Sequence, residues 1–73
     1  HRLQREAQVL DAVWRGLSTI HAMVEVLYAD VRMELHKPAR RSVLAHLVKL
    51  VADGLVAVEA GTLPRLDSTY VPA

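Results

Sequence analysis

The spacing of apolar residues changes after Gly54, and this change constrains the fold more than any other feature of the chain. Before Gly54, apolar residues recur three and four positions apart, which is the period of one face of an α-helix. After it come two short segments rich in β-branched and aromatic residues, LVAVE and STYVP, which predict strands. Between them, AGTLPRLD contains Gly61 and Pro64 and predicts an irregular turn.

Three helices are expected before the spacing changes. The first covers residues 3–15 and is followed by Gly16, a residue suited to the left-handed conformation that often ends a helix. The second begins at Ile20, after two residues with capping hydroxyl groups. The third runs from about residue 36 to 53, with Pro38 in its first turn, where proline is tolerated.

Each expected helix has one apolar face that should contribute to the core. These faces are Leu3, Ala7, Leu10, Trp14 and Leu17 in the first helix, Ile20, Met23, Val24, Leu27 and Tyr28 in the second, and Ala39, Val43, Leu47, Leu50 and Val51 in the third. Trp14 is the largest of these side chains and is therefore expected to anchor the core. Three helices followed by a two-stranded ribbon form an α+β winged helix, so residues 1–73 are expected to be one such domain.

Composition narrows the class of protein. A chain of 73 residues can barely build a sufficient core, and this one has no cysteine for a disulfide or a cysteine-based zinc site. Its apolar fraction of 52% is high for so small a unit, so part of that surface is expected to face a partner or another domain. There is no signal-peptide pattern and no apolar run near the roughly 18 residues of a membrane span, which predicts a cytoplasmic protein without membrane contact.

Three longer stretches are more specific than the periodicity. They are HRLQREAQVL, VEVLYADV and LHKPARRSVLAHLVKLVADGLV. The combination of HR..RE..VL with A..SVLAHL.KL...G.V resembles the β-lactamase-associated winged helix, the C-terminal domain of metallo-β-lactamase-fold hydrolases, from His1 to about Val58. After the capping threonine, where such domains usually carry acidic residues, this chain has Ile20, His21 and Ala22.

The resemblance implies a role for His1. In these hydrolases the histidine of the HR..RE stretch is the last metal ligand of the catalytic domain, so His1 is expected to bind Zn²⁺ in the parent protein and no metal within the 73 residues alone. The implied parent uses a zinc-activated water to attack an ester, thioester or phosphodiester, with this domain beside the catalytic domain and its substrate cleft. The alternative is that His1 is merely where the sequence begins.

No catalytic residue is expected within the chain itself. His46 lies between apolar neighbours of the third helix and is expected to be partly buried and hydrogen-bonded. Neither His21 nor His36 has a second histidine four positions away or the HExxH context of a zinc site. No serine has the surroundings of a nucleophile elbow.

The main alternative is a DNA-binding winged-helix regulator, because the third helix of this fold often enters the major groove. The face of that helix opposite its core stripe has Lys37, Arg41, Ala45, Val48, Lys49 and Ala52. Alanine and valine at the centre of this face cannot hydrogen-bond to base edges, and the net charge is only +1. Sequence-specific DNA is therefore not an expected partner. Arg40 and Arg41 could instead hold a phosphate or a partner's carboxylate. A dimerisation module, giving a homodimer, is a third reading.

Overall fold

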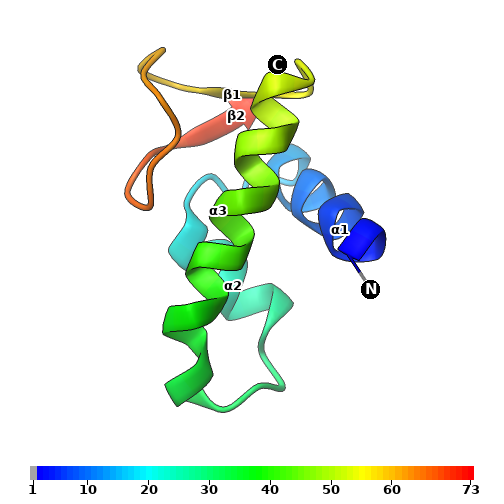
Figure 1. Ribbon diagram of the computed structural model, residues 1–73, viewed down its shortest axis with the longest axis vertical. Helices are drawn as coiled ribbons and strands as arrows, with labels where there is room; N and C mark the ends of the chain where they lie inside the picture. The colour runs from blue at the N-terminus through cyan, green and yellow to red at the C-terminus, as the bar shows by residue number, and fades with distance from the viewer. Residues whose placement is uncertain (1) are drawn as a thin grey trace.

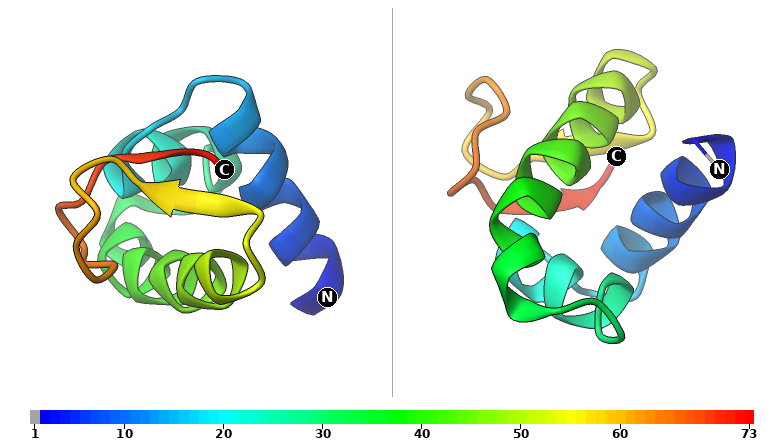
Figure 2. Two further views of the ribbon diagram at one scale, coloured as in Figure 1. Left: turned by 90° about the horizontal axis from the view of Figure 1, so that it is seen from above. Right: turned by 60° about the horizontal axis from the view of Figure 1, so that its bottom comes forward.

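The computed structural model describes residues 2–73, with side chains from residue 4 onward, and has the predicted order of helices followed by strands. Its elements are α1 (Arg2–Trp14), α2 (Ile20–Leu27), the short 3₁₀ helix η1 (Met33–Leu35), α3 (His36–Ala52), β1 (Val56–Val58) and β2 (Tyr70–Pro72). The three α-helices surround one core, and the strands close it along one side (Figures 1 and 2). The fold is an α+β winged helix, as predicted.

Glycines end two of the helices. Gly54 has a φ of 77°, and its N–H donates to the carbonyl of Val51, while the N–H of Leu55 donates to that of Leu50. This pair of bonds satisfies carbonyls that the end of α3 would otherwise leave free. Gly16, with a φ of 94°, makes the same arrangement after α1. The left-handed conformation predicted for Gly16 is confirmed, and Gly54 adopts it too.

Thr19 links the helices to the sheet. Its side-chain hydroxyl accepts a 3.2 Å hydrogen bond from the N–H of Ala22, which caps α2 despite the missing acidic residues. Thr19 also forms an isolated antiparallel bridge with Thr69, just before β2. Thr19 thus pairs, as a single residue, with the chain that leads into β2.

The two strands pair antiparallel, in the register Val56 with Pro72, Ala57 with Val71 and Val58 with Tyr70. They are joined by residues 59–69, which we call the wing loop. In Figure 1 this loop, drawn in yellow to orange, lies to one side of α3. It carries Leu63 and Leu66, both strongly exposed.

The buried core confirms the predicted faces of the second and third helices. It consists of Val9, Ala12, Val13, Ile20, Met23, Val24, Ala39, Val43, Leu47, Leu50, Val56, Val58 and Tyr70. Leu27, Tyr28 and Val51 are partly buried against it. Hydrophobic burial from three helices and both strands thus holds one small unit together.

The predicted core face of the first helix is wrong. Trp14 is 60% exposed and Ala7 is also exposed, whereas Val9 and Val13 are fully buried. Leu10 and Leu17 are only partly buried, and the side chain of Leu3 lies outside those described. At 100° per residue, the buried face is rotated by roughly a third of a turn from the predicted one. Small β-branched side chains, rather than the indole, fit where α1 approaches α3 and β2.

Candidate functional site

His1, the predicted zinc ligand, lies outside the residues that the structure describes. Within residues 2–73, no three histidine, aspartate or glutamate side chains come close enough together to hold a metal ion. The described part of the chain therefore does not fit zinc by itself. Any zinc site that uses His1 must take its other ligands from elsewhere.

Arg40 and Arg41 come together at a pocket, which we call the basic pocket. It has a volume of about 520 Å³ and is lined by Glu34, Lys37, Pro38, Arg40, Arg41 and Leu66. All but Glu34 and Leu66 belong to the first two turns of α3. Leu66 comes from the wing loop, so the pocket is formed by segments far apart in the sequence.

Arg40 is incompletely paired at this pocket. Its Nη2 lies 3.3 Å from Nδ1 of His21, whose Nε2 lies 2.8 Å from a carboxylate oxygen of Glu25. Because the guanidinium can only donate, this bond requires a neutral imidazole with its proton on Nε2, facing Glu25. The Nε of Arg40 is buried and has no hydrogen-bond partner among the described residues. Such an unpaired donor is unusual in a folded protein.

The outward face of α3 is exposed along its length, as predicted. Lys37, Arg41, Ala45, Val48, Lys49 and Ala52 are all exposed. The basic residues of this face are confined to its two ends, and the centre is apolar. Val48 is one of eight large hydrophobic side chains exposed in the described part of the chain.

A second polar cluster joins α1 to α3 and was not predicted. Glu6, whose side chain is only 17% exposed, accepts a 3.1 Å hydrogen bond from Lys49. Lys49 also binds Asp53 at 3.0 Å. Hydrogen bonds to Asp53 and then Glu6 raise the pKa of Lys49 above its ordinary value of 10.5. Lys49 thus bridges two helices as a stable cation.

His46 belongs to the same cluster. Its side chain is 14% exposed, which confirms the predicted partial burial. The nearest carboxylate oxygen, on Glu6, is 3.8 Å from its Nδ1, beyond hydrogen-bond distance. The predicted hydrogen bond is therefore not found among the described residues. The two residues are 40 positions apart, so only the packing of α1 on α3 could bring them together.

His36 has a structural role at the start of α3. Nε2 of His36 lies 2.9 Å from the carbonyl oxygen of Tyr28 and 3.0 Å from that of Val31. Donation to these carbonyls ties the start of α3 to the chain that leaves α2. His36 therefore fixes the loop between the two helices.

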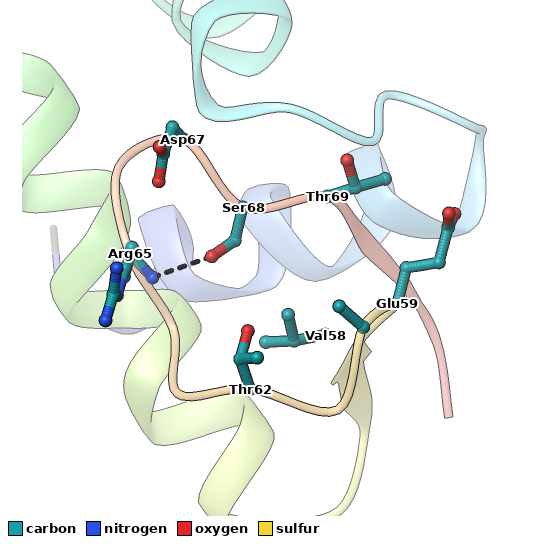
Figure 3. Close-up of a pocket in the computed structure, with 8 residues that line it drawn as sticks. Val58, Glu59, Thr62, Arg65, Asp67, Ser68 and Thr69 are labelled. Carbon is teal, nitrogen blue, oxygen red and sulfur yellow. Dashed lines mark hydrogen bonds between the residues drawn. The ribbon is translucent and has the colours of Figure 1, made fainter.

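A second pocket, of about 410 Å³, lies inside the wing loop (Figure 3). In that view its two acidic residues, Glu59 and Asp67, lie at opposite ends. The hydroxyl of Ser68 accepts a 3.0 Å hydrogen bond from the backbone N–H of Arg65 and stabilises the turn. The lining contains one basic and two acidic residues, and the Ser68 hydroxyl is used by the loop, so the pocket favours no particular chemistry.

No helix in the described part of the chain is both long and apolar enough to span a membrane. No solved structure matches the chain. A family model described as the beta-lactamase associated winged helix domain matches residues 19–62, which include α2, α3 and β1. The match covers more than half of the 73 residues and agrees with the observed order of helices and strands. The chain belongs to the β-lactamase-associated winged helix domain family.

Proposed function

We propose that this chain is the C-terminal domain of a zinc-dependent, metallo-β-lactamase-like hydrolase, and that it packs beside the catalytic domain and borders the substrate cleft. The family match supports an association with a β-lactamase-type protein. The zinc belongs to the proposed catalytic domain, with His1 as one ligand. Residues 2–73, whose described side chains form no metal site of their own, would help to shape the border of the substrate cleft.

The observation that carries the packing role is the exposure of Trp14. This indole is 60% exposed at the end of α1, on the side turned away from the core. Tryptophan is enriched in the buried centres of protein interfaces, where it supplies a large contact area. A second domain resting on α1 would remove that surface from water. Such a contact also accounts for the high apolar fraction of so small a domain.

The outward face of α3 argues against base-specific DNA recognition. Ala45 and Val48 stand at its centre, and neither can make the paired hydrogen bonds that distinguish bases in the major groove. A regulator that reads a sequence needs such side chains at that position.

The proposal is tested by expressing this chain together with the catalytic domain that is proposed to precede His1. Zinc content and hydrolysis of model ester, thioester and phosphodiester substrates are measured on the purified protein. We expect bound zinc and turnover of one of these classes. A preceding segment that binds no zinc and hydrolyses none of them would contradict the proposal.

Docking is tested in the same protein with Trp14→Ala. Removal of the indole should increase proteolytic cleavage between the two domains, because it deletes the contact without touching the core. Val48→Ala is the matched control, since Val48 is also exposed but lies on α3. Equal cleavage in both variants would argue against α1 as the docking face.

A further inference from the structure

We propose that the basic pocket binds a phosphate ester. The pocket lies between the first two turns of α3 and Leu66 of the wing loop. Figures 1 and 2 show the loop, in orange, beside the green helix. Its volume of about 520 Å³ is within the range of small-molecule sites, roughly 300–1,000 Å³. It is large enough for a phosphate group and the body attached to it.

The charges of the pocket are uncompensated. Within the described residues, none of Lys37, Arg40 and Arg41 has a carboxylate oxygen within 4.0 Å. By contrast, Arg15 pairs with Asp11 at 2.8 Å, and Lys49 pairs with both Glu6 and Asp53. Three cations that line one pocket without an ion-pair partner repel one another, and a bound anion would relieve this repulsion.

Glu34 is the one carboxylate among the residues that line the pocket. It is highly exposed and lies 3.8 Å from Nε of Arg32, which does not line the pocket. Its charge therefore faces a cation outside the site. With Glu34 counted in full, the lining side chains still leave a charge of +2, from three cations and one carboxylate.

Arg40 supplies a donor that lacks an acceptor. Among residues whose side chains the structure describes, its guanidinium is held by one 3.3 Å bond to His21, and its buried Nε has no partner. A small rotation of this side chain toward the pocket would present two parallel N–H groups to an anion, the geometry that arginine uses for phosphate and carboxylate. The present arrangement leaves that capacity unused.

Phosphate fits the site better than a carboxylate. A phosphomonoester has a charge of about −1.5 to −2 near neutral pH and three acceptor oxygens, which matches a net lining charge of +2. One carboxylate brings a single charge and two oxygens. Pro38 and Leu66 form an apolar wall beside the cations, where a sugar, base or alkyl body can rest. The phosphate can belong to a small organic phosphate or to a nucleic-acid backbone.

The experiment compares three probes by titration: inorganic phosphate, adenosine monophosphate and a fluorescently labelled single-stranded 12-mer of DNA. The phosphate group alone should bind most weakly, since it lacks the body that contacts the apolar wall. Saturation by adenosine monophosphate with no gain for the 12-mer identifies a small phosphate ester as the ligand. Tighter binding of the 12-mer, with affinity falling as salt rises, identifies the backbone.

Variants decide whether the pocket is responsible. Arg41→Gln and Lys37→Gln should each weaken binding of the best probe by roughly tenfold or more, as expected for loss of one hydrogen bond to a charged group. Arg15→Gln removes the same charge just after the end of α1 and should leave binding unchanged. Leu66→Ala alters no charge and should weaken adenosine monophosphate but not inorganic phosphate.

Two outcomes overturn the proposal. One is that every probe binds more weakly than about 1 mM to the unaltered protein, whose folding is verified by circular dichroism. The other is that Arg15→Gln weakens binding as much as Arg41→Gln, which would mean diffuse attraction rather than a site. Because the substituted residues are exposed, the variants should remain folded.

Discussion

The guanidinium of Arg5 lies over the ring of Tyr28, 4.3 Å from the ring centroid. The same side chain donates a 3.2 Å hydrogen bond from Nη1 to the backbone carbonyl of Leu27, the last residue of α2. Arg5 thus connects α1 to the end of α2 by a cation–π contact and by satisfaction of a terminal carbonyl. Arg5 and Glu6 of the HR..RE motif therefore both connect helices, Arg5 to the end of α2 and Glu6 to Lys49 of α3.

Arg5→Ala should therefore reduce the free energy of unfolding by about 1–2 kcal/mol, from the combined loss of the ring contact and the hydrogen bond. Urea unfolding followed by circular dichroism measures the change. Arg15→Ala is the control, since its exposed i, i+4 pair with Asp11 contributes only about 0.3–0.5 kcal/mol. A loss for Arg5→Ala no greater than for the control would argue against the contact.

Trp14→Ala should change the stability of the 73-residue chain by less than about 0.5 kcal/mol, because the indole is exposed. Val13→Ala, one residue earlier, should cost roughly 2 kcal/mol, because two buried carbons are lost and a cavity is left. Thermal melts of both variants test the position of the buried face. A larger loss for Trp14→Ala than for Val13→Ala would restore the face predicted from the sequence.

Alkaline pH should destabilise the protein through Tyr70. Burial raises the pKa of this phenol above its ordinary value of 10.0, and its hydroxyl donates a 2.6 Å hydrogen bond to the carbonyl of Arg65. The folded state therefore holds the phenolic proton more tightly than the unfolded state. The contribution of Tyr70 to the free energy of unfolding is fully present below pH 10.0. It is lost as the pH rises from there through the pKa of the folded state.

Tyr70→Phe tests this mechanism. At pH 7 the free energy of unfolding of the variant should be about 1 kcal/mol lower than that of the unaltered protein, because the hydrogen bond is missing. Between about pH 9 and pH 11 the stability of the variant should fall by less than that of the unaltered protein. The comparison cancels the contribution of Lys49, whose raised pKa also makes stability fall at alkaline pH. Parallel pH dependence in the two proteins would exclude Tyr70 as the titrating group.

Duplex DNA should bind weakly and without sequence preference. The apolar centre of the α3 face offers no base readout, so only phosphate contacts at the basic pocket remain. At physiological salt we expect dissociation constants no tighter than about 10⁻⁶ M. Two duplexes of unrelated sequence, titrated side by side, should agree within a factor of about two. A strong preference for one of them would favour the DNA-binding regulator.

The helices and strands could be predicted because their signals are local. Gly16 and Gly54 end helices by their own conformational freedom, and the apolar faces of α2 and α3 are unambiguous. The first helix is different, because apolar residues occupy more than one of its faces. Val9 with Val13, and Ala7 with Trp14, have equally regular spacing, and only the approach of α3 and β2 decides between them.

The polar sites could be predicted only in part. Arg40 and Arg41 could be predicted as an anion site because both lie near the expected start of the third helix. Their pocket also needs Leu66, which the wing loop brings from a distant part of the chain. The contact between Glu6 and His46 likewise depends on tertiary packing. Spacing along one helix gives no signal for such pairs.

The proposed role of His1 as a zinc ligand of a hydrolase is tested by the zinc content of the full-length protein with His1→Ala. We predict less bound zinc and lower turnover than in the unaltered protein, with the unfolding of the winged-helix domain unchanged. His21→Ala, which removes an exposed histidine from the same domain, should keep full zinc content. Full zinc content and unaltered turnover in the His1→Ala protein would exclude His1 as a zinc ligand.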